Sequence, residues 1–502
     1  MQGSLEIIDI AILVGYCAVL VWMGVYFRKR CRTANDFMVA GRSIPAWAAG
    51  LAVMSAYTSS ISYIATPGAA FENNWHPIIF SICIVPVAWL VCKYVVPYYR
   101  KTQLISVYGF LEERLGSWGR FYAALSFLLY MVGRVAVILY LVSLLLVTFL
   151  PTSSGWQTET MAAVIVAIGV ITIVYTLLGG MEAVVWTDVM QSVVMIAGVL
   201  FCVVVLSRDI FAGPEPLVRT AIENSKFSIG SWDWSLSSRT VWVMIIYGVT
   251  ENLRNLMADQ NYVQKYSSVP TERQAKKTIW MAMAIYIPLT AIFLYIGTAL
   301  FAFYSGSDEL AKAGITKGDQ VFPYFIATQL PAGLKGLIIA AIVAAAMSTV
   351  DSALNCSATV LMLDFYKRHF RPDVDERGAI FFLRLATVVW GLLGTGFALL
   401  MIRARSALDV WWQISGIFGG GILGLFILSL LRIKLKLWQG LISIGASIVV
   451  ISWGTFARDL PDSWLWAQCD IDKIIIGAVG TAALVAVALI FGLMNRAGAT
   501  RA

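Results

Sequence analysis

Apolar segments of about 20 residues recur along the whole chain, and they constrain its fold more than any other feature. About 20 apolar residues are needed for a helix to cross the hydrocarbon core of a bilayer. Such a segment must be helical here, because lipid offers no partner for free backbone groups. Hydrophobic residues make up 59% of the 502 residues and charged residues only 13%, and the mean hydropathy is +0.78. We therefore predict an all-α integral membrane protein.

A scan for such segments predicts about thirteen transmembrane helices. The first is predicted to be a retained helix and not a cleaved signal peptide, because the short lead before it is acidic. The predicted spans are 7–27, 45–71, 76–98, 121–150, 160–178, 184–206, 240–264, 278–304, 335–365, 379–402, 407–431, 437–456 and 473–494.

Lysine and arginine cluster in alternate loops between these spans. Basic residues near span ends favour the cytoplasmic side of a membrane. The pattern predicts a multi-pass protein of the cell inner (plasma) membrane, with its N-terminus outside and its C-terminus cytoplasmic. The basic residues of these loops include Arg28, Lys29, Arg30, Arg100, Lys101, Lys276, Lys277, Lys367, Arg368 and Arg432.

The spans are arranged as two five-helix units of opposite orientation, 45–206 and 240–431. An extra helix precedes them at 7–27, and two further helices follow in 437–494. The first helix of each unit is interrupted by polar residues, which lie at 55–62 and 250–255. Paired interrupted helices indicate a binding site near the bilayer midplane in inverted-repeat transporters. We expect a single transmembrane transporter domain, 1–502.

Hydroxyl side chains gather in two distant spans. Lipid cannot replace water around a hydroxyl group, so such clusters are costly unless they bind something. A carbonyl from one helical turn and a hydroxyl from the next can converge on one sodium ion. The alternative is that serine and threonine join packed helices or bond back to the preceding turn. The predicted sodium ligands are Ser55 and Thr58 from the first span and Ala345, Ser348 and Thr349 from the second.

Two carboxylates and one guanidinium also lie within apolar spans. A charge at mid-membrane costs at least about 2.5 kcal/mol on insertion scales, so each indicates function. Asp351 follows Ser348 by three residues on the same helix face, whereas Asp188 could also be a helix N-cap or a first-turn acid. Arg134 either receives an anionic substrate or pairs with an internal acid such as Asp259 or Glu251.

The same composition argues against other classes of protein. The seven cysteines are scattered and only two histidines are present, so no paired acid, base or metal set indicates an enzyme or a cofactor. The net charge of +8 reflects membrane topology and not nucleic-acid binding. There is no room for the soluble output domain of a sensor, and no obligate protein partner is evident. A channel remains an alternative to a transporter.

Several short motifs resemble those of the sodium:solute symporter family, over nearly the whole chain. The most specific is Ala344-Ala345-Ala346-Met347-Ser348-Thr349, which is similar to the family's sodium motif. The other matching residues are Asp36-Phe37, Gly41-Arg42, Ser55–Ser62, Tyr175, Gly179-Gly180, Trp186-Thr187-Asp188, Gln191, Gln260 and Val263-Gln264-Lys265-Tyr266.

The resemblance implies a LeuT-type 5+5 inverted repeat that works by alternating access with Na⁺ as the coupling ion. Within the family the sialic acid symporters look most similar, chiefly through Gly133-Arg134-Val135-Ala136 and Val185-Trp186-Thr187-Asp188. In those proteins the arginine grips the substrate carboxylate. Their second sodium site would map here onto Asp188, Ser348, Asp351 and Ser352.

The residues expected around the substrate depart from the family patterns at several positions. Ser81 stands where the sialic acid transporters have a glutamine, and Tyr57 where a small hydroxyl residue is usual. We predict sodium-coupled import of a small polar solute, a carboxylate such as sialic acid, with a sodium/sugar cotransporter as the alternative. The predicted substrate-binding residues are Tyr57, Ser59, Ser62, Ser81, Arg134 and Asp259.

Overall fold

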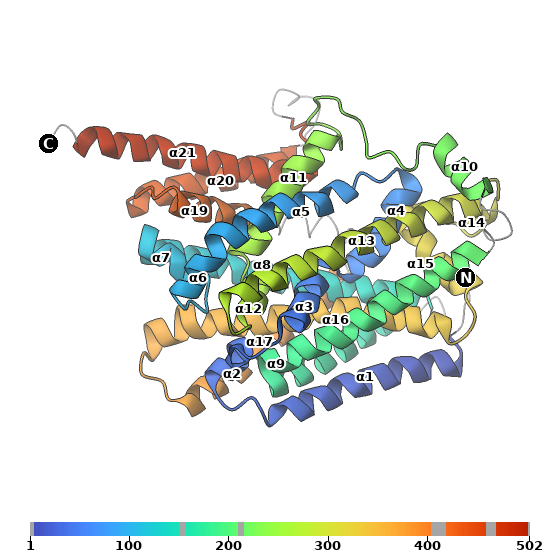
Figure 1. Ribbon diagram of the computed structural model, residues 1–502, viewed down its shortest axis with the longest axis horizontal. Helices are drawn as coiled ribbons and strands as arrows, with labels where there is room; N and C mark the ends of the chain where they lie inside the picture. Colours follow the sequence, from blue (N-terminus) through green and yellow to red (C-terminus); the bar gives the residue numbers. More distant parts are fainter. Residues whose placement is uncertain (1–4, 150–156, 209–214, 403–417, 458–467, 500–502) are drawn as a thin grey trace.

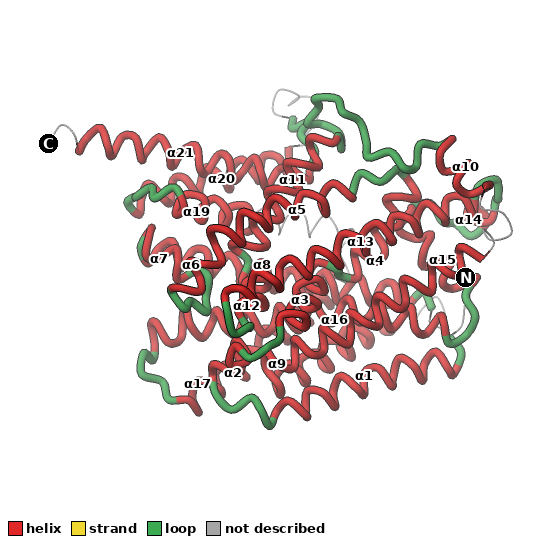
Figure 2. The backbone as a smooth tube through the Cα atoms, in the orientation of Figure 1, coloured by secondary structure: helices red, strands yellow, loops and turns green. Residues whose placement is uncertain are grey.

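A computed structural model describes residues 5–149, 157–208, 215–402, 418–457 and 468–499. In these ranges the chain is helical and contains no strand (Figure 2). The long helices run roughly side by side, and the two ends of the chain lie at opposite ends of the longest axis (Figure 1). That arrangement is expected of a chain that crosses the membrane an odd number of times.

The helices that form the predicted spans follow them closely, because span length is fixed by local hydropathy. In the first half they are α1 (Ile7–Arg28), α3 (Ala46–Tyr57), α4 (Ser60–Glu72), α5 (Ile78–Leu90), α6 (Val96–Lys101), α8 (Ser117–Val147) and α9 (Gln157–Arg208). In the second half they are α11 (Val241–Leu253), α12 (Gln260–Ser267), α13 (Glu272–Tyr304), α16 (Leu334–Val360), α17 (Glu376–Met401), α19 (Gly420–Leu430), α20 (Leu437–Phe456) and α21 (Ile476–Ala499).

Shorter elements complete the described chain. The stretches that separate predicted spans at 207–239 and 305–334 contain helices of their own, α10 in the first and α14 and α15 in the second. The short helices are α2 (Ala34–Val39), α7 (Gly109–Leu115), α10 (Glu215–Glu223), α14 (Glu309–Lys312) and α15 (Gly318–Gln329). The π-helical segments are Val91–Val95, Arg254–Ala258 and Leu361–Phe370, and single 3-10 turns lie at Ala40–Arg42 and Lys473–Ile475.

Helix α9 contains two of the predicted spans, 160–178 and 184–206, which meet at Gly180. Gly180 has φ 57°, ψ −149°, outside the helical region. Tyr175 and Thr187 both donate a hydrogen bond to Oδ2 of Asp351, at 2.7 and 3.4 Å. In a straight helix, residues twelve apart would be about 18 Å apart. The chain therefore turns back at Gly180, and the two spans are antiparallel.

Both predicted interruptions are present, although the second lies further along the chain than expected. Thr58 and Ser59 are extended and separate α3 from α4. In the second unit the polar residues of 250–255 stay helical, and the chain opens only at Asp259, with φ −96° and ψ 116°. Asp259 then caps α12 by accepting a hydrogen bond from the Asn261 N–H at 2.9 Å.

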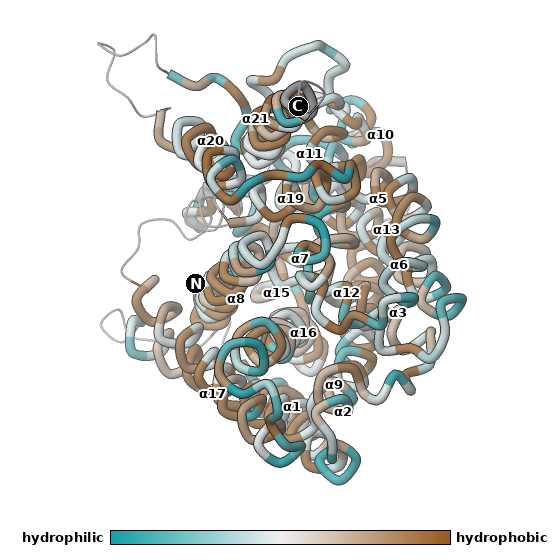
Figure 3. Tube along the Cα trace, turned by 90° about the vertical axis from the view of Figure 1, so that its left-hand side faces the viewer, coloured by the Kyte–Doolittle hydropathy of each residue, from teal (hydrophilic) through white to brown (hydrophobic). Residues whose placement is uncertain are grey.

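Helix α16 lies at the centre of the molecule and is buried along almost its whole length. Four helices lie at the periphery of the molecule and expose many apolar side chains, as a lipid-facing surface should: α1, α17, α20 and α21. Seen from the end that carries α7, the helices are largely brown and several connecting loops are teal (Figure 3). The predicted helix 407–431 lies partly outside the described residues, so the count of thirteen stays a prediction.

Candidate substrate and ion site

A cavity of about 320 Å³ lies where the two broken helices meet α5 and α8. Ligand pockets typically have volumes of about 300–1,000 Å³. Five of the six predicted substrate residues line it, namely Tyr57, Ser59, Ser62, Ser81 and Arg134. The sixth, Asp259, is not in its wall.

One part of this cavity is lined by the loop residues His76 and Arg239 and by Ile474 of a 3-10 turn. All three precede helices that run toward the end of the molecule bearing α7, so this part of the cavity lies toward the opposite end (Figure 1). His76 is buried, with only 6% of its surface exposed. The pKa of His76 is lowered to about 4, chiefly by burial and also by the positive charge of Arg239, while Asp472 acts in the opposite direction. His76 is therefore neutral at physiological pH.

Arg134 projects from the middle of α8 and is only 7% exposed. Its Nη2 donates to the carbonyl oxygen of Ala56 at 3.1 Å, and the Tyr262 hydroxyl donates to the same oxygen at 3.0 Å. The carbonyl belongs to the last turn of α3, just before the break, so Arg134 is fixed beside the interrupted helix. Among the described residues, no carboxylate forms an ion pair with it.

Arg254 forms ion pairs with Glu251 and Asp259, the two acids that the sequence offers as partners for Arg134. Its Nε lies 3.0 Å from Oε2 of Glu251, its Nη2 contacts Oε1 of the same carboxylate, and its Nη1 lies 3.5 Å from Oδ2 of Asp259. Its guanidinium also stacks on the ring of Tyr130 at 4.8 Å and donates to the Tyr130 hydroxyl at 3.1 Å. The alternative of direct internal pairing for Arg134 is therefore wrong.

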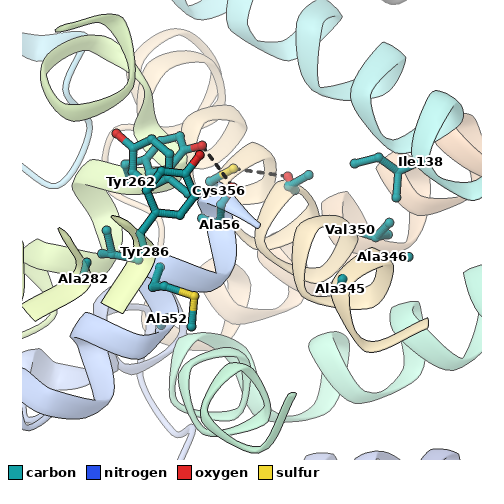
Figure 4. Close-up of a cluster of buried hydrophobic side chains, with 14 of the residues drawn as sticks. Ala52, Ala56, Ile138, Tyr262, Ala282, Tyr286, Ala345, Ala346, Val350 and Cys356 are labelled. Atoms are coloured by element: carbon teal, nitrogen blue, oxygen red, sulfur yellow. Dashed lines mark hydrogen bonds between the residues drawn. The ribbon is translucent and has the colours of Figure 1, made fainter. Parts of the chain in front are cut away.

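A group of tyrosine rings forms the wall beside Arg134. The Tyr57 ring centroid lies 4.6 Å from that of Tyr262 and 5.1 Å from that of Tyr286. Figure 4 shows Tyr262 and Tyr286 next to Ala56, with Ala345 of α16 further along. The Tyr57 hydroxyl is buried and has no hydrogen-bond partner in the described part of the chain. It is therefore a polar atom that a ligand could satisfy.

The predicted first sodium residues lie at the end of α3 and in the middle of α16, and these two helices are in contact. Ser348 and Thr349 both donate to the carbonyl of Ala345, at 3.2 and 3.1 Å. This is the back-bonding expected of helical hydroxyls, and it leaves their oxygen lone pairs free to accept a cation. Ser55 Oγ is buried and has no partner among the described residues, and Thr58 Oγ1 contacts Sδ of Met54 at 3.6 Å.

The predicted second sodium residues form a separate buried cluster around Asp351. In addition to the bonds from α9, Asp351 accepts one from Ser352 at 3.1 Å, and Ser352 Oγ also donates to the Ser348 carbonyl at 2.8 Å. Asp188 is fully buried, well inside the second arm of α9, and neither caps that arm nor lies in its first turn. Its Oδ2 lies 2.9 Å from Nζ of Lys265, close enough for an ion pair but not aligned as a hydrogen bond.

Sequence reasoning missed the partners of these charges. Arg254 was recognised only as one of several polar residues, although its spacing of three from Glu251 is a signal for a helical ion pair. Lys265 was part of a family motif, but nothing in the sequence placed its ammonium beside Asp188, 77 residues earlier. Its Nζ also donates to the Ala52 carbonyl at 3.0 Å, so it joins α12 to both α3 and α9.

A model of the sodium:solute symporter family matches residues 37–445. The chain belongs to this family. It is 31% identical over 475 residues to the sodium/sialic acid symporter SiaT of Proteus mirabilis, with 94% of each chain covered. It is 25% identical over 460 residues to the human sodium-coupled monocarboxylate transporter 1, covering 90% of this chain and 73% of that one. These relatives are transporters and not enzymes.

Solved structures agree with this assignment. The fold matches a Na⁺-coupled sialic acid symporter, in a substrate-bound outward-open state, with a TM-score of 0.88 and 29% identity, covering 97% of this chain and 98% of that one. The nucleobase-cation symporter Mhp1 matches with a TM-score of 0.57 at 13% identity, covering 91% of this chain and 95% of that one, which shows a shared fold alone. The predicted LeuT-type architecture is confirmed.

Proposed function

We propose that this protein is a sodium-coupled symporter that imports a small carboxylate, such as sialic acid. One observation carries the proposal: Arg134 lies in the cavity wall with its guanidinium not ion-paired to any acid of the described residues. A guanidinium presents a planar fork of donors that matches a carboxylate. The names of two relatives, both sodium/sialic acid symporters, support the same substrate class.

The charges around the cavity also suggest why sodium and an anion would bind together. Arg134 and Arg254 carry two positive charges, and Glu251 and Asp259 carry two negative ones, so these four side chains are neutral overall. A bound carboxylate adds one negative charge in a medium of low dielectric constant. A sodium ion between Ser55, Thr58, Ala345, Ser348 and Thr349, near the break of α3, would offset it.

The test is uptake into proteoliposomes with an imposed inward sodium gradient. We expect uphill accumulation of sialic acid, abolished when potassium replaces sodium outside. Arg134→Gln should lose uptake, and Arg377→Gln, an exposed change on α17, should not. Accumulation of glucose or galactose but of no carboxylate would favour the sugar cotransporter. Flux that never exceeds equilibrium would favour the channel.

We further propose that the inverted repeat comprises 45–206 and 240–431, flanked by 7–27 and 437–494, with the N-terminus outside and the C-terminus in the cytoplasm. The interrupted helices at the start of both units support this division. Arg100 and Lys101 at the end of α6 and Arg432 after α19 lie in or next to the loops at the α7 end of the molecule, which supports placing that end in the cytoplasm. Accessibility of single cysteines introduced in these loops to an impermeant thiol reagent in intact cells would test the orientation.

A second sodium at Asp188, Ser348, Asp351 and Ser352 has a measurable consequence. One sodium with a monovalent anion moves no net charge, so a tenfold sodium gradient supports only about tenfold accumulation. A second sodium would raise that limit to roughly 5,000-fold at 100 mV, since one net charge then crosses at about 2.3 kcal/mol. We expect uptake by the wild type to depend on membrane potential and the Asp351→Asn variant to lose that dependence. Potential-independent uptake by the wild type would contradict the second site.

A further inference from the structure

A second cavity, of about 160 Å³, lies between α6, α7 and α19, at the end of the molecule that carries the basic loops. It is separate from the substrate cavity and shares no lining residue with it. One buried water needs only about 10–15 Å³, so this cavity could accept a larger polar group. None of the predicted transport residues lies in its wall.

The polar wall of this cavity is made of arginine and tyrosine. Arg114 is half-buried, and its Nε has no hydrogen-bond partner in the described part of the chain. Arg432 follows α19 in a left-handed backbone conformation, with φ 55°. No acid is among the residues that line the cavity; the neighbouring Glu113 accepts a hydrogen bond from the Tyr98 hydroxyl. Two guanidiniums without a lining acid favour an anion, and arginine suits phosphate oxygens in particular.

The rim of the cavity is apolar and faces the lipid. Tyr94 and Leu430 line the cavity and remain 56% and 47% exposed. Lys93 Nζ lies over the rings of Trp89 and Tyr94, at 4.7 and 5.2 Å from their centroids. Aromatic rings with a lysine that reaches along them are typical of the membrane–water interface. A ligand that binds the arginines of the wall and also packs against the apolar rim must have an anionic head and an apolar tail.

We propose that this cavity binds the phosphate headgroup of an anionic phospholipid, with its acyl chains lying along Leu430 and Tyr94. Basic pockets between transmembrane helices are known to accept such headgroups. A soluble phosphate compound would share the interaction with Arg114 and Arg432 but would gain nothing from the apolar rim.

The position of the cavity gives the lipid a structural role. Met257 lines it, and the Tyr99 hydroxyl donates to the Met257 carbonyl at 2.7 Å. Met257 is three residues beyond Arg254, within the π-helical segment that leads to the break before α12. A bound lipid therefore supports one face of the π-helical segment Arg254–Ala258, whose other face lines the substrate cavity.

The experiment uses the full-length protein in a neutral detergent and measures its thermal unfolding midpoint. We expect phosphatidylglycerol to raise the midpoint in a saturable manner and phosphatidylcholine to leave it unchanged. The Arg114→Gln/Arg432→Gln double variant should need about fivefold more phosphatidylglycerol for each arginine removed. Lys29→Gln/Arg377→Gln, which removes two exposed basic residues elsewhere in the molecule, should respond as the wild type does.

An equal response of the double variant and the wild type would overturn the site. A shift of the same size with soluble glycerol phosphate would overturn the lipid as its ligand. If the double variant does not fold, Arg432→Gln alone serves, because that side chain is exposed. Native mass spectrometry should then show fewer retained phosphatidylglycerol molecules than in the wild type, and an equal number would refute the proposal.

Discussion

The two broken helices differ in how they satisfy the groups that the break exposes. Between α3 and α4 the side chains are neutral, and the hydroxyls of Ser55 and Ser60 are buried without partners among the described residues. Between α11 and α12 the side chains are charged, and Arg254 engages both Glu251 and Asp259. The first break has unused oxygens, whereas the second neutralises much of its own charge.

This difference indicates a division of labour. An unwound helix with free oxygens is suited to a cation that comes and goes. A buried ion-pair group is instead costly to disturb and holds its own segment in place. The charge available to an anionic substrate comes from neither break but from Arg134 on α8, which bonds to the last turn of α3.

The largest effect should follow from removing the central cation of the charged break. Arg254→Met leaves the buried Asp259 and the half-buried Glu251 without their partner, and we expect a loss of about 3–5 kcal/mol in the free energy of unfolding. Equilibrium unfolding in detergent measures it. Adding Glu251→Gln and Asp259→Asn to this variant should recover most of the loss. A single variant as stable as the wild type would show that the group is not structural.

Arg134→Lys should weaken the binding of the substrate and leave the stability of the fold unchanged. An ammonium cannot reproduce the guanidinium fork, and a hydrogen bond to a charged group contributes about 1.5–3 kcal/mol. We expect roughly 10- to 100-fold weaker carboxylate binding by isothermal titration, with the unfolding midpoint unchanged in the absence of substrate. Arg254→Lys is the matched control and should lower that midpoint. The reverse pattern would exchange the roles of the two arginines.

The double variant Ser348→Ala/Thr349→Ala should weaken the binding of sodium at the neutral break. Each lost ligand should cost about 1 kcal/mol, so the sodium concentration for half-maximal uptake should rise roughly 10- to 30-fold. Ser357→Ala, another buried hydroxyl on the same helix, is the control and should leave sodium activation as it is. Unchanged sodium activation in the double variant would remove the basis for a cation site there.

At neutral pH the smallest effect should come from His76 in the cavity wall, because its effect on stability develops only below about pH 6.5. The pKa of His76 is about 4 in the folded protein because of burial, and about 6.5 when unfolded. Between these values only the unfolded state binds the proton, so stability should fall as the pH drops from 6.5 to 4, by at most about 3 kcal/mol. His76→Gln should flatten this slope, and His369→Gln, at an exposed position, is the control. A slope that is the same in all three proteins would argue against a buried neutral imidazole.

Much of the architecture follows from local properties of the chain. Span length, the polar interruption at 55–62 and the family motifs are all local patterns. They predicted helix α20 to the residue and a break within 55–62, which the structure places after Tyr57. The second break was placed too early, because polarity alone does not show that Glu251 and Arg254 satisfy each other within an intact helix.

The sequence by itself determined that this is a helical membrane transporter of the sodium:solute symporter family, because hydropathy and motifs act over short distances along the chain. Only the tertiary structure decided which charges meet. Arg254 and not Arg134 pairs with Glu251 and Asp259, and Lys265 lies beside Asp188. Such pairings depend on distances of a few ångströms between charges on helices that are far apart in sequence. The electrostatic energy of two charges falls as the distance between them grows, and that distance is set by how the helices pack.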